Sequence, residues 1–164
     1  MLKPTPEVTN ALGYCVGIAK QRDGVELHSL SAMSNHEHMD ATDPFGDISK
    51  FEGYFKSLTA RSLNCHYGRW EYSWAPRDGR QDVTSRQAAI AGMAYIAANP
   101  VLDGIVSHGI QWEGVRTRPE QLGTTRTIAR PRIKFFPKKS KMPAEVEFTL
   151  SIPRGLIRDS SGWP

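Results

Sequence analysis

The sequence predicts an α+β fold in which helices pack on an antiparallel sheet, and three observations support this class. Segments with apolar residues at helical spacing occur together with short segments of strand-like composition. Their order is helix, strand pair, helix, helix and two late strands, which is typical of an α+β sandwich. The chain has 164 residues, enough for one domain, or one domain with an extension, to bury most of its apolar surface.

Each expected element has local start and stop signals. The expected helices span residues 6–23, 48–67 and 86–98, and the expected strands span residues 25–33, 36–42, 129–136 and 145–153. The polar residues expected to cap the three helices are Thr5, Asp47, and either Thr84 or Ser85. Gly24 and Gly68 are expected to end the first two helices. Pro100 is expected to end the third at Asn99, because proline disfavours helical geometry in the residue before it.

The composition excludes several classes of protein. No apolar run approaches the ~18 residues that a membrane-spanning helix needs, and the N-terminal residues lack the apolar core of a signal peptide. Cys15 and Cys65 have no metal-binding spacing and are expected to be reduced, half-buried packing residues. The sequence has no glycine-rich phosphate-binding loop of the ATPase type. We therefore expect a cytoplasmic protein without a membrane partner, whose chemistry needs no ATP.

Positive charge is concentrated in one segment. The chain carries a formal net charge of +4, but residues 115–142 alone carry nine Lys and Arg against one Glu, a net charge of +8. The rest of the chain therefore carries −4. Such a segment is what neutralisation of nucleic-acid phosphates would use, although a solvated basic loop explains it equally well.

Two histidines separated by one residue are the main candidates for metal binding. Alternate side chains of a strand share a face, so His36 and His38 would point the same way, and Asp40 would follow them. Two imidazoles on one face can bind one divalent ion, but two neighbouring surface histidines are the simpler interpretation of the pair alone. On the third helix, Tyr95 and Asn99 are four residues apart and share a face that could meet the same ion.

Several motifs in collinear order resemble one family. The segment MSNHEHM resembles the MPNHVH signature of HUH endonucleases. FKSLTARSLNCHYGR followed by Trp, and AYIAANPVLDGIV, resemble FKSRYARYFNRRYGR…W and YIELNPVRAGLV of the REP-associated tyrosine transposases. The resemblance runs from about Gly13 to Val106, and Trp112 fits the family's downstream Trp. Several motifs in order are far more specific than the histidine pair alone.

The resemblance implies a ferredoxin-like α+β sandwich that cuts and rejoins single-stranded DNA at or near imperfect hairpins. Tyr95 stands at the position of the nucleophile, which forms a 5′-phosphotyrosine and leaves a free 3′-hydroxyl. His36 and His38 stand at the metal-ligand pair, and Asn99 at the residue that completes or supports the metal site. Mg²⁺ or Mn²⁺ would be the cofactor. Asp40 would be either an extra ligand or a sign that this sequence has drifted from the family pattern.

The same resemblance divides the chain and predicts its partners. Residues 1–113 would form the catalytic domain, and residues 114–164 a basic extension with a β-hairpin. The expected partner is single-stranded or hairpin DNA in a bacterial cytoplasm, bound by a monomer or a homodimer. The residues expected to contact DNA phosphates are Lys56, Arg61, Arg116, Arg118, Arg130, Arg132 and Lys134. Trp70, Tyr72 and Trp74 could stack on unpaired bases, although such aromatic bridges more often belong to a core.

Two features depart from the family pattern. The residue between the histidines is normally apolar because it faces the packed side of the sheet, whereas here Glu37 needs a partner such as Lys or Arg unless that face is open. Relatives carry a full strand before the first helix, and residues 1–4 supply only a stub of it. A transposase-derived protein that binds DNA without cutting it is therefore the alternative. A third interpretation is a metal-dependent hydrolase that uses His36, His38 and Asp40 on another substrate.

Overall fold

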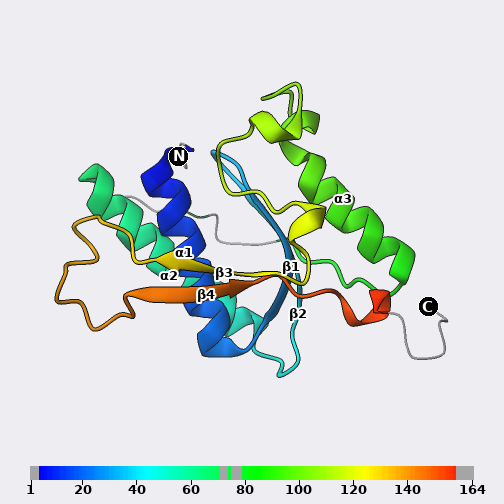
Figure 1. The fold of residues 1–164 in the computed structure, drawn as a ribbon, viewed down its shortest axis with the longest axis horizontal. Helices are drawn as coiled ribbons and strands as arrows, with labels where there is room; N and C mark the ends of the chain where they lie inside the picture. The colour runs from blue at the N-terminus through cyan, green and yellow to red at the C-terminus, as the bar shows by residue number, and fades with distance from the viewer. Residues whose placement is uncertain (1–3, 71–73, 75–78, 158–164) are drawn as a thin grey trace.

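The computed structural model describes residues 4–70, 74 and 79–157 of the chain. Its helices are α1 (Pro6–Asp23), α2 (Ile48–Tyr67) and α3 (Arg86–Leu102), and its strands are β1 (Glu26–Ala32), β2 (Glu37–Thr42), β3 (Thr125–Ala129) and β4 (Glu145–Thr149). The predicted α+β class is confirmed. Helices α1 and α2 lie on one side of the ribbon formed by β1 and β2, and α3 lies on the other (Figure 1).

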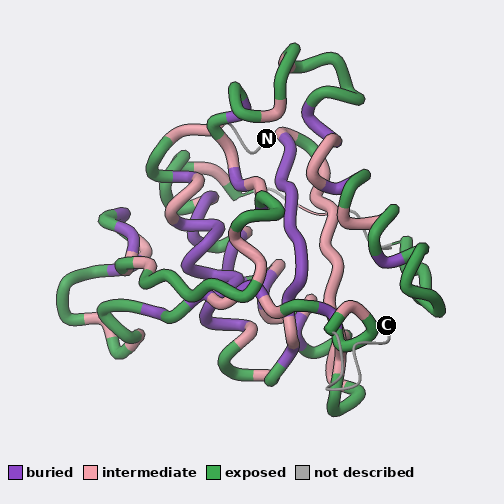
Figure 2. The backbone as a smooth tube through the Cα atoms, turned by 45° about the vertical axis from the view of Figure 1, so that its right-hand side comes forward, coloured by how far each residue is buried: buried purple, intermediate pink, exposed green. Residues whose placement is uncertain are grey.

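Helix α1 begins and ends at the residues that the sequence indicates. The Thr5 hydroxyl accepts a hydrogen bond from the Val8 N–H at 3.3 Å, and Gly24 takes the left-handed conformation at φ 69° while its N–H donates to the Lys20 carbonyl. Because α2, β3 and β4 all pack against α1, most of the helix is buried. Strand β1 is the other continuously buried segment and runs through the centre of the molecule (Figure 2).

The strands form two separate antiparallel sheets of two strands each, β1–β2 and β3–β4, instead of the expected single sheet. The second expected late strand is confirmed as β4, although β4 ends at Thr149 and not at residue 153. The first is wrong, because β3 spans Thr125–Ala129 and the following residues 130–144 form a loop. Pro131 explains the difference, since it lacks the N–H that a residue paired within a strand would donate.

Chain segments from the C-terminal third cover the edge of β1 that faces away from β2. The Ala32 N–H donates to the Val115 carbonyl at 2.8 Å, and the Thr117 N–H donates to the Leu30 carbonyl at 2.8 Å. Val115 and Leu30 also belong to one hydrophobic core, which joins α1, α2, β1 and the β3–β4 hairpin. The residues after position 113 therefore complete the same core as the residues before it.

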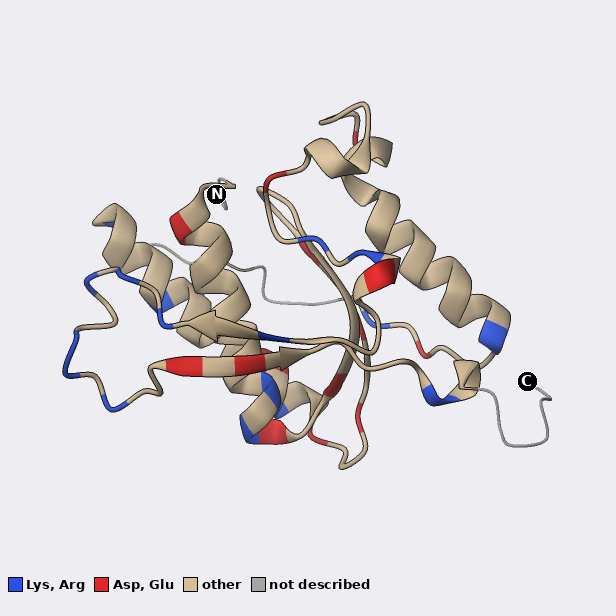
Figure 3. Cartoon of the chain, viewed as in Figure 1, with Lys and Arg blue, Asp and Glu red and all other residues tan. Residues whose placement is uncertain are grey.

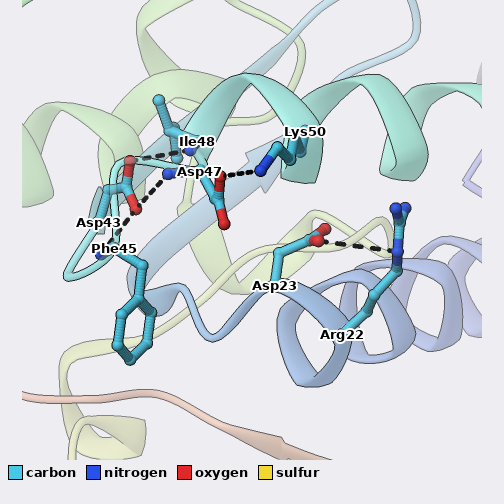
Figure 4. A network of polar contacts seen from close by, with 7 residues as sticks. All are labelled: Arg22, Asp23, Asp43, Phe45, Asp47, Ile48 and Lys50. Atoms are coloured by element: carbon cyan, nitrogen blue, oxygen red, sulfur yellow. Dashed lines mark hydrogen bonds and ion pairs between the residues drawn. The ribbon is translucent and has the colours of Figure 1, made fainter.

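The cap of α2 differs from the expectation. Asp47 occupies the capping position, but its side chain makes no capping hydrogen bond. Asp43 takes this role instead, because its two carboxylate oxygens accept from the backbone N–H of Asp47 at 2.9 Å and of Ile48 at 2.8 Å. Asp47 forms an ion pair with Lys50 (Figure 4). A bend over residues 43–46 brings Asp43 close enough to replace the expected cap.

Helix α3 starts as expected but ends later. The Ser85 hydroxyl accepts from the Ala88 N–H at 3.1 Å, which settles the choice between Thr84 and Ser85. The predicted end at Asn99 is wrong, because the helix continues through Pro100 to Leu102. Proline in the last turn forfeits one backbone hydrogen bond only, and the burial of Pro100 and its neighbour offsets that loss.

The aromatic bridge after α2 is partly core and partly surface. The Trp74 indole donates to the Lys56 carbonyl at 2.9 Å, and its ring lies 5.8 Å from that of Phe55, so Trp74 is a packing residue. Trp70 is 98% exposed. Tyr72 lies outside the described residues. Within the described part of the chain, no helix combines the length and the apolar character needed to cross a membrane.

Candidate active site

Strand β2 presents two histidines to α3. Leu30 of β1 pairs with Met39 of β2, and both side chains point into the core. The next pair, Ser31 and His38, must therefore point to the opposite face, where α3 lies. His36 directly precedes β2 and is two residues from His38, so its ring lies on the same face. The predicted sharing of one face by the two imidazoles agrees with this register.

The His36 ring connects β2 to α3. Its Nε2 lies 3.2 Å from Oδ1 of Asn99, and its Nδ1 lies 2.9 Å from Oδ1 of Asn35. Asn99 is only 1% exposed, so the contact between helix and hairpin holds its amide in place. A polar contact at one ring nitrogen orients the imidazole and directs the other nitrogen toward a ligand. The contact brings His36 Nε2 and Asn99 Oδ1 close together. Because an amide oxygen only accepts, Nε2 carries the hydrogen in this contact and would have to lose it to bind a metal ion.

Tyr95 lies one helical turn before Asn99, on the same face of α3. Its ring packs edge-on against His38, with 5.3 Å between the ring centroids, and the His36 and His38 rings are 5.0 Å apart. Tyr95 is nevertheless 50% exposed, which keeps its side chain accessible from solvent. The structure thus brings together the four residues that the resemblance singles out, from the hairpin and from α3.

Asp103 also reaches this group, and the sequence analysis missed it. Its Oδ2 lies 3.6 Å from Nε2 of His36. The residue caps the end of α3 and follows Asn99 by four positions, as Asn99 follows Tyr95, so it lies just beyond the same face of the helix. This four-residue spacing was visible in the sequence, but the expected helix end at Asn99 concealed it.

The kinds of donor atom present, and the separation of one pair of them, are compatible with a divalent cation. Two imidazoles and an amide oxygen are ligand types that such ions accept in proteins. Adjacent ligands of an octahedral ion with bonds of about 2.1 Å are about 3.0 Å apart. The 3.2 Å between His36 Nε2 and Asn99 Oδ1 is close to that separation. Among the described residues no group of three His, Cys, Asp or Glu side chains is arranged to hold a metal ion, so the two histidines and a carboxylate could share an ion only after side-chain movement.

The electrostatic surroundings favour a neutral His38. Burial lowers the pKa of its imidazole, and the nearby His36 lowers it further, whereas the negative charge of Asp103 acts in the opposite direction. The neutral imidazole is the form that binds a metal ion. His38 is thus ready to act as a ligand near neutral pH without first losing a proton.

The structure does not bring Asp40 into this group. Asp40 pairs with Ser29 across the hairpin, beyond His38 on the side away from His36. Burial raises the pKa of its carboxyl, and the charged group that most opposes this effect is His28. The His28 ring is held by the Ser151 carbonyl and the Thr42 hydroxyl, both at 2.8 Å. Asp40 therefore lies on the same face of the hairpin as the histidines but in a neighbouring polar patch with His28.

Glu37 has the basic partner that its position requires. Its Oε1 lies 3.5 Å from Nζ of Lys56 on α2, and both side chains are largely buried. This pair lies on the core side of the hairpin, opposite the histidines. Lys56 is therefore held away from the candidate site. Arg61, one and a half turns further along α2, is exposed and packs over the Phe135 ring.

The basic segment divides into two parts. The Arg116 guanidinium donates to the Ala97 carbonyl of α3 at 3.0 Å, and Arg118 is exposed two residues later. The loop of residues 130–144, called the basic loop below, lies at the opposite end of the molecule from α3 (Figure 3). Its exposed cations include Arg132 and Lys134. Arg130 instead stabilises the loop by donating to the carbonyls of Lys138, Ser140 and Met142.

No family model, curated protein or solved structure matches this chain. The residues of the site and their geometry therefore carry the proposal that follows.

Proposed function

We propose that this chain is a metal-dependent endonuclease and strand transferase for single-stranded DNA, with Tyr95 as its nucleophile. The observation that carries the proposal is the packing of the Tyr95 ring against His38, beside the contact between His36 and Asn99. The motif resemblance described above supports the same reaction. The arrangement of three helices around the β1–β2 hairpin is compatible with a reduced ferredoxin-like sandwich.

In the proposed reaction the Tyr95 hydroxyl oxygen attacks the phosphorus of a phosphodiester. The bond between phosphorus and the 3′-oxygen breaks, the phenol loses its proton, and the departing 3′-oxygen gains one. Attack by a 3′-hydroxyl on the phosphotyrosine reverses these steps and restores the phenol, so rejoining needs no nucleotide. When bound, a divalent ion such as Mg²⁺ or Mn²⁺ would stabilise the charge that develops on the phosphate oxygens. His36, His38 and Asn99 would hold that ion.

Arg116 provides a phosphate-binding group near this site. Arg116 pairs with Ser31, and Ser31 pairs with His38, so the three residues form a row across neighbouring strands. Strands lie about 4.8 Å apart, which places Arg116 about 10 Å from His38 on the face that α3 covers. Arg118, two residues after Arg116 along the chain, is exposed. We propose that these two arginines bind the phosphates next to the scissile bond.

The basic loop would contact DNA at a greater distance. Exposed Arg132 and Lys134 lie there, and Arg61 of α2 packs over Phe135 in the same region. A hairpin with its single strand at Tyr95 would have to extend along the molecule to reach this loop. These cations would neutralise backbone phosphates without reading sequence.

The test is formation of a covalent protein–DNA adduct. The full chain is incubated with Mn²⁺ and a varied library of labelled single-stranded hairpin oligonucleotides, and the products are separated on a denaturing protein gel. A labelled band that shifts with the protein is expected for the wild type and for Tyr67→Phe, a control tyrosine on α2. No band is expected for Tyr95→Phe or in the presence of chelator. A library that yields no adduct dependent on Tyr95 would overturn the proposal.

A second candidate is a protein that binds hairpin DNA without cutting it. The observation in its favour is that, among the described residues, β2 pairs with β1 alone, so the strand that presents the histidines has an open outer edge. A site on an open edge is held less rigidly than a site on a central strand. This candidate predicts salt-sensitive hairpin binding that is unchanged by Tyr95→Phe and by chelation.

A further inference from the structure

Asp103 occupies a position that its own helix does not explain. It caps the C-terminal end of α3, where the unpaired carbonyls make the helix end negative, and a carboxylate is disfavoured there. The last turn of α3 carries no Lys or Arg that would compensate. The ion pair that the structure gives to Asp103 is with His36, at 3.6 Å. His36 is a compensating charge only when its ring is protonated.

The carboxylate faces the donor atoms of the candidate metal site. His36 Nε2 lies 3.2 Å from Asn99 Oδ1 and 3.6 Å from Asp103 Oδ2. One nitrogen thus has two oxygen neighbours; the first separation is close to the roughly 3.0 Å between adjacent ligands of an octahedral ion, and the second is longer, so Asp103 would have to move toward the ion. The Asp103 side chain is 38% exposed, so it can make the small adjustment that coordination needs. Asn99 lies in the last turn of α3 and Asp103 caps that turn, so both oxygens lie at the same end of one helix.

We infer that Asp103 is an anionic ligand of the divalent ion that His36, His38 and Asn99 would bind. This inference rests on the proposed function for the existence of the ion, and it adds a carboxylate to a set of otherwise neutral donors. A carboxylate is a ligand that Mg²⁺ and Mn²⁺ favour, and it offsets part of the positive charge that the ion brings into a half-buried site. The cation in turn compensates the carboxylate at the helix end.

The inference has a structural consequence. With Asn99 and Asp103 on α3 and His36 and His38 on the hairpin, the bound ion would join the C-terminal end of α3 to the hairpin. The ion would then stabilise the folded chain by mass action, because the unfolded chain has no such site. Tyr95 lies on the same helix face, so the joined helix would hold the phenol in a fixed place beside His38.

The test measures Mn²⁺ binding directly. The full chain, Asp103→Asn and Asp40→Asn are titrated with MnCl₂ by calorimetry, and free Mn²⁺ is followed by electron paramagnetic resonance. Asn has the shape of Asp without its charge, and Asp40→Asn removes a carboxylate from the same side of the hairpin outside the site. The dissociation constant is expected to rise by at least about tenfold for Asp103→Asn and to stay unchanged for Asp40→Asn. The rise in melting temperature with added Mn²⁺ should shrink in parallel.

The possible results separate this inference from the proposed function. Wild-type Mn²⁺ affinity in both Asp103→Asn and Asp103→Ala would overturn the inference and leave the proposed nuclease intact. Tight binding that depends on Asp103, with no covalent DNA adduct, would support the inference and overturn the nuclease. Absence of Mn²⁺ binding by the wild type would overturn the inference as well. Circular dichroism of each metal-free variant confirms that it is folded before titration.

Discussion

Glu37 Oε1 lies 3.5 Å from Lys56 Nζ on the face of β2 opposite the two histidines. This ion pair explains how a carboxylate can stand between two candidate metal ligands without pointing at the metal. Strand alternation sends Glu37 into the contact with α2, where Lys56 compensates its charge. The pair therefore fixes the orientation of β2 through a contact with α2 on the face opposite the histidines.

Replacing Lys56 should destabilise the folded chain, because the largely buried Glu37 carboxylate would lose this basic partner. Lys56→Met is expected to lower the free energy of unfolding by about 1–3 kcal/mol, because Glu37 keeps its charge in a largely buried place. Glu37→Val in the same chain should recover most of that loss. Urea denaturation of the two variants measures both effects, and a double variant no more stable than Lys56→Met would refute the assigned pairing.

A close contact between α1 and β4 gives a prediction about packing. A Cβ atom at Gly17 would lie 2.9 Å from Cγ1 of Val146, whereas one at Gly53 on α2 would meet nothing within 4 Å. Gly17→Ala should therefore destabilise the protein by about 1–3 kcal/mol through overpacking. Gly53→Ala should instead stabilise α2 by about 0.5–1 kcal/mol. Thermal or urea unfolding measures the stability of both variants. Equal effects at both positions would contradict the packing of the β3–β4 hairpin on α1.

The parts of the fold that local signals determine were predictable. Thr5, Ser85 and Gly24 act at the helix ends where the sequence places them, and β1, β2 and β4 follow their strand-like segments. The cap by Asp43 was not predictable, because a bend in the chain brings its carboxylate to the backbone N–H of Ile48, five residues later. The division into two sheets was not predictable either, since backbone groups near position 115 pair with β1 across more than eighty residues.

The site was predictable where it depends on periodicity and not where it depends on a helix end. Alternation along β2 places His36 and His38 together, and helical spacing places Tyr95 with Asn99. Asp103 lies one turn further along that same helix face, but Pro100 indicates an earlier end. Tertiary packing outweighed the local preference of proline here, because Asn99 and Pro100 are both buried.

The Asp43 cap predicts a pH dependence of stability. Desolvation acts to raise the pKa of the Asp43 carboxyl, but hydrogen bonds from the backbone N–H groups of Asp47, Ile48 and Phe45 outweigh it and lower the pKa below its ordinary value. The folded chain therefore binds this proton less readily than the unfolded chain does. The stabilisation is complete above the unfolded pKa, near ~3.9, and is lost as pH falls through the lower folded value.

Asp43→Ala tests that linkage. The melting temperature of the variant should be lower than that of the wild type near neutral pH. The difference between the two melting temperatures should become smaller as the pH falls below about 4. Melting curves followed by circular dichroism between acid and neutral pH give the comparison. A difference that stays constant across that range would show that the carboxylate charge does not cap α2.

The two thiols should differ in reactivity. Both are free, but Cys15 is completely buried whereas Cys65 is exposed, so the expectation of a half-buried packing residue is wrong for Cys65. Burial raises the pKa of the Cys15 thiol to about 11, and the hydrogen bond between its Sγ and the Ser62 hydroxyl offsets only part of that effect. Alkylation at mildly basic pH should label Cys65 alone in the folded chain and both cysteines in denaturant, as read by mass spectrometry. Rapid labelling of Cys15 in the folded Cys65→Ser variant would contradict the burial of Cys15 in the core.

Paramagnetic broadening of side-chain NMR signals by substoichiometric Mn²⁺ shows where the ion binds. If the hairpin and α3 hold one cation, the rings of His36, His38 and Tyr95 should broaden together, while Tyr67, which is also exposed on a helix, should stay sharp. Broadening that spares Tyr95 and the two imidazoles, or that appears first at the carboxylates around Asp43 and Asp47, would contradict a cation held between the hairpin and α3.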